Sequence, residues 1–145
     1  SSWLGSWCGY WLSSCARIIT ASHSSFTLQP CGAYAGGKRS ALLMQSSGVG
    51  NCINALALPN ICRVPFLTLV SMRGEWGEFV PWQVPMGLGT PKVLEAMDIK
   101  VFRADYKEEV GSTVDAAARF AFNTNRSAAV LLSQKMIGAK QFKNG

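Results

Sequence analysis

Residues 46–51, Ser-Ser-Gly-Val-Gly-Asn, have the composition of a turn that binds a ligand through its backbone. They follow an apolar run over residues 40–44, interpreted as a short buried strand, and precede a helical pattern that begins at Cys52 and that Pro59 is expected to end. At such a junction free N–H groups and the positive end of the helix dipole can meet a bound group. Glycine permits a positive φ or a close approach to a ligand. Such glycines also serve packing alone, so the local pattern leaves both interpretations open.

A second candidate is the segment 71–89, which is rich in Gly, Pro and Trp. We expect a long loop here, and a loop of this length in so compact a chain is usually functional or mobile. It follows a predicted buried strand over residues 64–70, whose apolar and β-branched residues fit a sheet covered on both faces. The loop carries several side chains that could act in a site: Arg73, Glu75, Glu78, Trp82 and Gln83.

The remaining sequence alternates predicted helices and strands. A helix of small residues is expected to end at the glycines of segment 32–37, and Thr90 and Pro91 are placed as the N-cap and first residue of another helix. The apolar face of that helix is formed by Val93, Leu94 and Met97. Later elements are a strand over 99–103, a helix over 106–123 with an alanine-rich face, a strand over 127–133 and a basic, exposed tail over 135–145.

This alternation indicates an α/β fold of three layers, with a mainly parallel sheet and helices on both faces. Ligands of such sheets bind beyond the carboxyl ends of the strands. Because segments 46–51 and 71–89 both follow strands directly, we expect them to lie at the same edge and to share one site.

The composition excludes several classes of protein. The 145 residues are enough for one domain with a core, and the 48% hydrophobic and 15% charged content argues against disorder. A net charge of +6 could indicate a nucleic-acid partner, but the basic residues are scattered and do not interleave with aromatic ones. We therefore expect no nucleic-acid partner. No apolar run reaches the ~18 residues of a membrane span, so no membrane association is predicted.

The five cysteines, at positions 8, 15, 31, 52 and 62, are odd in number and show no Cys-x-x-Cys spacing. Neither a complete disulfide framework nor a zinc site is therefore predicted. The later cysteines lie in apolar contexts and are expected to be small buried hydrophobes in a reducing compartment, the cytoplasm. The single histidine, His23, lies in a Ser-rich stretch and is expected at the surface rather than as a base.

Residues 1–30 differ from the remainder of the chain. They contain no Asp or Glu and hold three tryptophans at four-residue spacing, which could line one face of a helix: Trp3, Trp7 and Trp11. We assign residues 1–30 to an atypical N-terminal segment, disordered or disrupted, and residues 31–142 to the domain.

Several stretches of that domain together resemble a known family: residues 32–39, residues 44–51 with Asn54, residues 72–75 and residues 81–85. They are similar to the pyrimidine-binding domain of thiamine-diphosphate-dependent 2-oxoacid decarboxylases, and in particular to the alpha subunits of the sulfopyruvate and phosphonopyruvate decarboxylase family. The Ser-Gly-x-Gly turn alone is shared by many thiamine-diphosphate enzymes, whereas the combination is more specific. The resemblance implies the pyrimidine-domain type of α/β fold.

The resemblance implies that this chain contributes the aminopyrimidine side of a thiamine-diphosphate site, lined by Ser47, Gly48, Gly50 and Asn51. A diphosphate-binding (beta) subunit with a Gly-Asp-Gly motif is the implied partner, and it would bind the diphosphate through Mg²⁺. This chain has no Gly-Asp-Gly, and Mg²⁺ needs carboxylate ligands of that kind. We therefore expect no metal ligand here and a site that works only at an interface.

The implied substrate is a 2-oxoacid with an anionic sulfonate or phosphonate head group. Arg73 is the expected partner of that anion, because its planar fork matches a tetrahedral oxyanion; a salt bridge with Glu75 or Glu78 is the alternative. Gln83 resembles the glutamine that loops of this family direct towards the substrate, and a solvated loop residue is the alternative there.

One essential position departs from the family. Members carry a glutamate ahead of segment 32–37 that hydrogen-bonds the pyrimidine ring and promotes the reactive form of the cofactor. Here Ser24 or Ser25 stands at the expected place, and a hydroxyl cannot hold the proton as a carboxylate does. Pro30 is also expected to interrupt a helix of the family. We therefore expect no catalytic residue in this chain, and little or no decarboxylase activity even with the partner.

Three interpretations stay open. The chain is a decarboxylase subunit whose residues 1–30 are a disrupted version of the family N-terminus, or a degenerate, non-catalytic relative that acts as a binding or regulatory module. A generic small α/β nucleotide-binding protein is the third.

Overall fold

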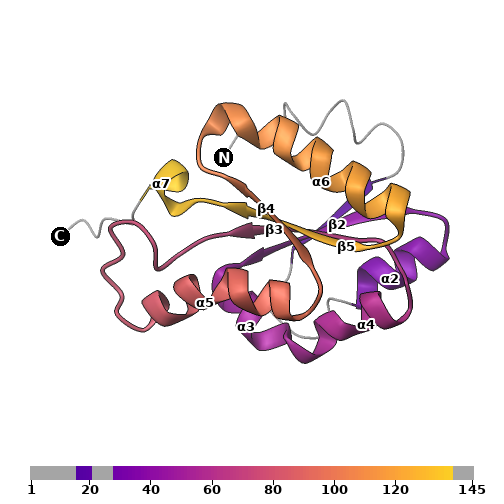
Figure 1. Cartoon of the computed structure of the whole chain (residues 1–145), viewed down its shortest axis with the longest axis horizontal. Helices are drawn as coiled ribbons and strands as arrows, with labels where there is room; N and C mark the ends of the chain where they lie inside the picture. Colours follow the sequence, from indigo (N-terminus) through magenta and orange to yellow (C-terminus); the bar gives the residue numbers. More distant parts are fainter. Residues whose placement is uncertain (1–15, 21–27, 139–145) are drawn as a thin grey trace.

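The computed structural model describes residues 16–20 and 28–138, which form an α/β fold around one parallel sheet. Within these residues the sheet has five strands in the order β1-β2-β3-β5-β4, and each neighbouring pair is parallel. All strand carboxyl ends therefore lie at one edge (Figure 1). The strands are β1 (Ala16–Thr20), β2 (Arg39–Gln45), β3 (Phe66–Ser71), β4 (Lys100–Ala104) and β5 (Ser127–Leu132).

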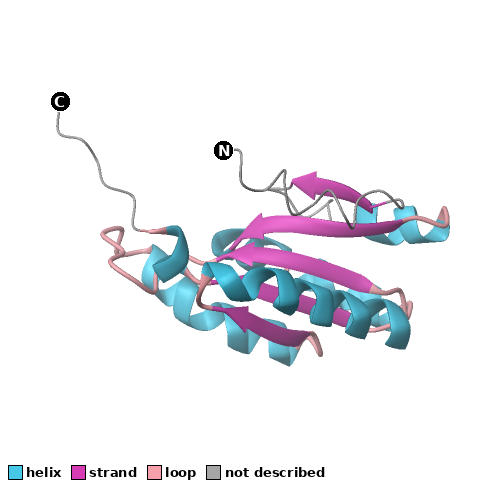
Figure 2. Ribbon diagram, turned by 90° about the horizontal axis from the view of Figure 1, so that it is seen from above, coloured by secondary structure: helices cyan, strands magenta, loops and turns pink. Residues whose placement is uncertain are grey.

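Helices cover both faces of the sheet, which confirms the predicted three-layer fold. The connections from β1 to β2, β3 and β4 all move in one direction across the sheet, whereas the connection from β4 to β5 moves back. Because parallel crossovers are right-handed, the helix between β4 and β5 lies on the face opposite to the other helices. Figures 1 and 2 show α6 (Val110–Thr124) lying across that face. The other face carries α2 (Leu28–Ala35), α3 (Ser46–Cys52), α4 (Ala57–Ile61) and α5 (Gln83–Ala96).

Each face of the sheet packs its own apolar layer. The layer under α3 and α5 contains large side chains, among them Leu42, Phe66 and Leu94. The layer under α6 has the alanines of α6, with Ala128 and Val130 of β5, at its buried centre, and larger side chains such as Leu67 and Phe102 complete it. The predicted apolar faces of both helices are confirmed, since Leu94 is fully buried beside partly buried Val93 and Met97, and the buried alanines of α6 are Ala117, Ala118 and Ala121.

Segment 46–51 is helical, which corrects the expectation of a turn. α3 begins at Ser46, directly after β2, so its glycines lie inside a helix and neither has a positive φ. The chain continues through a short 3₁₀ turn, η2 (Asn54–Leu56), into α4. Pro59 lies in the first turn of α4 instead of ending a helix, because the N–H groups of a first turn have no partner within the helix.

The expected loop 71–89 is shorter than predicted, because α5 begins at Gln83. Thr90 and Pro91 lie in the middle of α5, so their placement as a helix start was wrong. The fully buried Thr90 donates its hydroxyl hydrogen to the Met86 carbonyl at 2.7 Å. Pro91 has no N–H for the Gly87 carbonyl. The sequence alone does not distinguish a Thr-Pro pair at the start of a helix from one inside a helix that tertiary packing stabilises.

The other elements agree with the sequence to within a few residues. The strands expected over 64–70, 99–103 and 127–133 are β3, β4 and β5. The helix expected over 106–123 is a 3₁₀ turn, η3 (Lys107–Glu109), followed by α6. The tail expected over 135–145 begins within a short helix, α7 (Gln134–Ile137), in which Lys135 is exposed as predicted and Met136 is half-buried.

β1 is a strand that the sequence analysis does not predict, and it lies within residues 1–30. It pairs with β2 from Ala16 opposite Arg39 to Thr20 opposite Leu43. The division into an atypical segment and a domain stays a prediction. Trp3, Trp7, Trp11, His23, Ser24 and Ser25 lie outside the described residues.

α2 contradicts one expectation and confirms another. Pro30 lies in its first turn and does not interrupt it. The helix ends where the glycines were expected to stop it: a turn follows Ala35, and Gly37 takes a φ of 73°.

The described cysteines are free thiols, and their environments differ. Cys52 is buried, as predicted, and burial raises the pKa of its thiol, so it stays neutral. Cys31 is half-buried, whereas Cys62 is exposed, so the prediction of a buried hydrophobe was wrong for Cys62. No helix within the described ranges has the length and apolar character that spanning a bilayer requires.

Candidate functional site

The two segments singled out by the sequence meet at the carboxyl edge of the sheet, as predicted. The backbone N–H of Arg73 donates to Ser46 Oγ at 3.2 Å, which ties the segment 72–82, here called the edge loop, to the first residue of α3. Gly50 lies so close to α5 that a Cβ there would be 2.8 Å from Met86 Sδ.

Two glycines let the edge loop contact the start of α5. Gly74 has a φ of 81°, and a Cβ on it would lie 2.2 Å from the carbonyl oxygen of Gln83. A Cβ on Gly87 would lie 2.0 Å from the carbonyl oxygen of Arg73. Backbone cannot yield at these distances, so only glycine fits at either position. The loop is therefore fixed directly against the helix that follows it.

The Glu78 carboxylate lies at the centre of the edge loop, and only 3% of its side chain is exposed. It accepts a bidentate pair from Arg73, Nε at 3.0 Å and Nη2 at 2.9 Å, and a bond from Gln134 Nε2 at 3.0 Å. The backbone N–H groups of Gly74 and Val80 also donate to it, at 3.3 and 3.1 Å. Such a convergence of donors onto one charged acceptor stabilises the loop as a unit.

These donors keep Glu78 ionised. The hydrogen bonds from Arg73 are the largest cause that lowers the pKa of Glu78 to about 2, and they outweigh the opposing effect of burial. A carboxylate with this pKa carries no proton near neutral pH. Glu78 can therefore anchor the loop but cannot act as an acid there.

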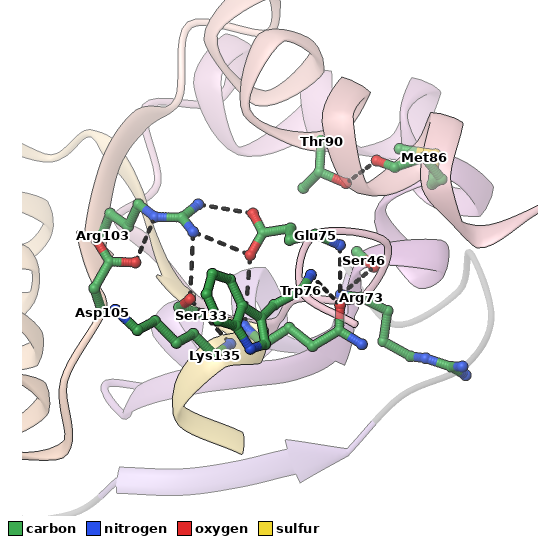
Figure 3. A network of polar contacts seen from close by, with 11 residues as sticks. Ser46, Arg73, Glu75, Trp76, Met86, Thr90, Arg103, Asp105, Ser133 and Lys135 are labelled. Carbon is green, nitrogen blue, oxygen red and sulfur yellow. Dashed lines mark hydrogen bonds and ion pairs between the residues drawn. The ribbon is translucent and has the colours of Figure 1, made fainter. Parts of the chain in front are cut away.

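Arg73 forms the salt bridge that the sequence analysis kept as the alternative. Its Nε and Nη2 both face Glu78, and 24% of its side chain is exposed. In Figure 3 the Arg73 side chain extends away from the neighbouring pair of Glu75 and Arg103.

A second ion pair lies at the ends of β3 and β4. Arg103 donates to Glu75 through Nη1 at 2.8 Å and Nη2 at 3.0 Å, and through Nε to Asp105 at 2.9 Å. The hydrogen bond with Glu75 is the first cause that raises the pKa of Arg103 above its ordinary value. Because the Arg103 side chain is 39% exposed, solvent screens the pair and its contribution to stability is small. Figure 3 shows this pair joining Glu75 of the edge loop to Arg103 of β4.

Gln134 joins the two ion pairs and was missed by the sequence analysis. Its Oε1 accepts the backbone N–H groups of Glu75 at 2.9 Å and Trp76 at 3.0 Å, while Nε2 donates to Glu78. The residue is 3% exposed, so these bonds have little competition from water. A signal was present: Ser133 and Gln134 directly follow β5, and polar residues at a strand's carboxyl end belong to the edge where ligands bind.

The four residues expected to line the pyrimidine side all lie on α3. Ser47 is half-buried and donates to Gln45 Oε1 at 3.4 Å, and Asn51 is exposed. A Cβ on Gly48 would meet Met44 Cβ at 3.4 Å, an ordinary contact, whereas Gly50 faces Met86. The packing interpretation therefore holds for Gly50, and Ser47 and Asn51 are the members of this set with polar side chains.

Gln83, the first residue of α5, carries an unusual atom. Its Oε1 is the one buried side-chain nitrogen or oxygen within the described residues that has no hydrogen-bond partner. An unpaired buried acceptor costs about 1–3 kcal/mol. Gln83 is thus half-buried rather than solvated, and its acceptor is available to a donor that reaches the start of α5.

The site has polar groups that suit the pyrimidine ring of thiamine diphosphate, but it has no group that suits the role of the activating acid. Ser47 and Asn51 offer a hydroxyl and an amide at the carboxyl edge, which suits holding a polar aromatic ring. The activating acid has no equivalent among these groups, because Glu75 and Glu78 are both committed to arginines. No cluster of His, Cys, Asp or Glu suited to a metal ion occurs within residues 16–20 and 28–138.

Known proteins place these features in a family. No protein-family model matches the sequence. The sulfopyruvate decarboxylase subunit alpha of Methanococcus maripaludis is 39% identical over 102 residues, covering 70% of this chain and 61% of that protein. The protein of the same name from Methanocaldococcus jannaschii is 37% identical over 101 residues, covering 69% and 60%. That from Methanothermobacter thermautotrophicus is 41% identical over 107 residues, covering 70% and 62%.

The chain therefore spans about three fifths of the length of the curated relatives it matches. Agreement at this level over about 100 residues, with the parallel sheet and both expected segments in place, extends well beyond a short motif. The chain belongs to the family of the sulfopyruvate decarboxylase alpha subunits.

Proposed function

We propose that this chain is the pyrimidine-binding part of a thiamine-diphosphate-dependent decarboxylase that acts on sulfopyruvate or phosphonopyruvate. The observation that carries the proposal is the 37–41% identity to proteins named sulfopyruvate decarboxylase subunit alpha. The word "subunit" in those names supports a partner chain. We assign to that partner, a diphosphate-binding beta subunit with a Gly-Asp-Gly motif, the Mg²⁺ and the diphosphate.

In this proposal α3 supplies the pyrimidine side of the site. Ser47 and Asn51 would hold the ring through hydrogen bonds, and Gly48 and Gly50 would set the position of α3 against its neighbours. Thiamine diphosphate, when bound, supplies the electron sink that decarboxylation of a 2-oxoacid requires. This chain's own contribution is to orient the ring and to form one wall of a site that excludes water.

Arg73 and Gln83 are the proposed substrate-binding residues, and both lie where the edge loop meets α5. An anionic head group would use the Arg73 donors that Glu78 leaves free, or would exchange with Glu78. Gln83 would use its side-chain Oε1, which is buried and lacks a partner in the described chain. A donor on the ligand or partner would remove the cost of that unpaired acceptor.

The same residues predict that the chain does not activate the cofactor. Ser24 or Ser25 stands at the position where the family carries its activating glutamate. Glu78 cannot replace the missing acid, because its pKa of about 2 keeps it ionised. This observation keeps a second candidate function as the alternative: a non-catalytic relative that acts as a binding or regulatory module on the same fold.

Isothermal titration calorimetry of thiamine diphosphate with Mg²⁺, with and without a Gly-Asp-Gly-containing partner, tests the proposal. We expect heat of binding only when both chains are present, and weaker binding after Asn51→Ala. Saturable binding by this chain alone would contradict the division between two chains and favour a generic nucleotide-binding protein. No binding even by a verified complex would leave the regulatory module as the function.

A further inference from the structure

Arg73, Arg103 and Lys135 are cationic side chains of the carboxyl edge, and they differ in how their charge is balanced. Both arginines form ion pairs with carboxylates, either of the edge loop or of the residue that follows β4. Lys135, in α7, has no carboxylate partner within the part of the chain that the structure describes. Of these three positive charges, that of Lys135 is therefore the one that no carboxylate neutralises.

Lys135 is held between two aromatic rings. Its Nζ is 5.4 Å from the ring centre of Trp76, on the edge loop, and 5.2 Å from that of Tyr106, which follows β4. In Figure 3 its side chain runs alongside Trp76. Two cation–π contacts favour one position of a side chain that is otherwise flexible, so a ligand that pairs with the ammonium group removes less conformational freedom.

The backbone beneath these side chains is also fixed. The N–H of Lys135 donates to Ser133 Oγ at 3.2 Å, and that of Trp76 donates to Gln134 Oε1 at 3.0 Å. Arg103 Nη2 donates to the same Ser133 Oγ at 3.4 Å. Lys135 is therefore part of the hydrogen-bond network that joins the edge loop to the ends of β4 and β5.

Arg73 is poorly suited to supply the net charge that an anion requires. Exchange of Glu78 for the anion would leave a carboxylate that is 3% exposed without its cationic partner, which is strongly unfavourable. If Glu78 stays in place, the free donors of Arg73 can still form hydrogen bonds, but the ion pair as a whole carries no net charge.

We propose that Lys135, held between Trp76 and Tyr106, pairs with the sulfonate or phosphonate head group of the 2-oxoacid, while Arg73 contributes hydrogen bonds alone. An ammonium group acts as a point charge with three donors and does not require one orientation of the anion, so it suits either head group. This inference rests on the proposed function. It deepens that function by naming the charge that favours an anionic head group over an uncharged one.

The test is calorimetric titration of the full chain in complex with a Gly-Asp-Gly-containing subunit, loaded with thiamine diphosphate and Mg²⁺. Sulfoacetate and phosphonoacetate are the probes, because they carry the two head groups and a carboxylate but no keto group. Lys135→Met removes the charge and keeps most of the aliphatic stem. It is expected to raise the Kd of both probes about 10-fold and to reduce the dependence of that Kd on salt.

A matched control separates a local contact from the loss of one positive charge anywhere on the chain. Lys100, the first residue of β4, is also exposed and lies at the opposite edge of the sheet. Lys100→Met is expected to change the Kd of either probe by no more than about two-fold, because solvent screens a charge at that distance. Circular dichroism and melting temperature verify that both variants fold.

Two further variants distinguish pairing with the anion from a structural role. Lys135→Arg keeps the charge and can stack on the same rings, so it is expected to restore the affinity to within about three-fold of wild type. Tyr106→Leu removes one of the two cation–π contacts and is expected to raise the Kd about 2- to 5-fold. The Kd of thiamine diphosphate for the complex is expected to stay unchanged in all these variants.

The outcomes separate this inference from the proposed function. A wild-type complex that binds both probes, with no loss in Lys135→Met, would overturn the role of Lys135 and leave the proposed function standing. A loss confined to one probe would support the inference for that head group and overturn it for the other. Failure of the wild-type chain to form a complex that binds thiamine diphosphate would overturn the proposed function, and the inference with it.

Discussion

α3 and the edge loop carry the two candidate patterns of the sequence, but different forces position them. In α3 the glycines lie within a helix, and Gly50 allows close packing on Met86. In the edge loop, Glu78 accepts hydrogen bonds from nearby residues such as Val80, and Gln134, which is distant in sequence, bonds to both Glu78 and the backbone of Glu75. The comparison teaches that glycines after a strand do not by themselves mark a ligand cradle, whereas polar groups at several strand ends form a connected site.

The largest effect is expected where the edge loop touches α5. Gly74→Ala would force a side chain into a positive φ and bring its Cβ within 2.2 Å of the Gln83 carbonyl oxygen. We expect a loss of about 3 kcal/mol or more in the free energy of unfolding, measured by urea denaturation.

The control for that change is Gly89→Ala in the same region. Gly89 lies inside α5, and a Cβ there would meet nothing within 4 Å. Alanine at this position is expected to stabilise the protein by about 0.5–1 kcal/mol. Equal effects of the two substitutions would show that the close approach at Gly74 is not what holds the loop.

A smaller effect is expected from Gln134→Ala. The substitution leaves the N–H groups of Glu75 and Trp76 without their acceptor and removes one donor from Glu78. We expect a loss of about 1–3 kcal/mol and faster hydrogen exchange at residues 75 and 76. Unchanged exchange there would mean that the loop is held without Gln134.

In α3 the expected effect is smaller still. Gly50→Ala brings a Cβ to 2.8 Å from Met86 Sδ, the flexible end of a side chain that can move. The close contact destabilises the protein, whereas alanine favours the helix more than glycine does. The net loss in the free energy of unfolding is expected to be about 1 kcal/mol. With Met86→Ala present the same substitution should be neutral or stabilising, as a double-mutant cycle would measure. An unchanged cost would show that Met86 is not the contact that requires glycine.

The last comparison concerns pH. The folded pKa of Glu78, about 2, lies below its ordinary value of 4.5, so its contribution to stability is fully present above pH ~4.5 and is lost as the pH falls towards ~2. Between these values wild type should lose stability relative to Glu78→Gln, and above them the difference should be constant. A carboxyl titration of Glu78 by NMR with a midpoint near 4.5 would contradict the network.

The fold could be predicted from the sequence because apolar periodicity and breakers fixed most strands and helices locally. β3, β4, β5 and α6 needed no tertiary information. The start of α5 could not be predicted, since contacts between Gly87 and Arg73 outweigh the local signal of Thr90 and Pro91. β1 was missed because its five residues, Ala-Arg-Ile-Ile-Thr, lie in a stretch whose composition differs from the rest.

For the candidate site, the sequence located the segments but not the pairing of their side chains. That 46–51 and 71–89 share an edge followed from their positions directly after two strands of a parallel sheet. That Arg73 pairs with Glu78, and not with Glu75, depends on the turn made by Gly74 and Gly77, both of which take a positive φ. Gln134 joined the site only through β5, which is distant in sequence from the edge loop and next to it in space.

The most direct test of the account is sulfopyruvate turnover by the complex of this chain with a Gly-Asp-Gly-containing subunit, in saturating thiamine diphosphate and Mg²⁺. The account predicts a complex that binds the cofactor and releases CO₂ no faster than the partner alone, because Ser24 or Ser25 stands where the family carries its glutamate and Glu78 stays ionised. Robust CO₂ release that requires this chain would contradict it.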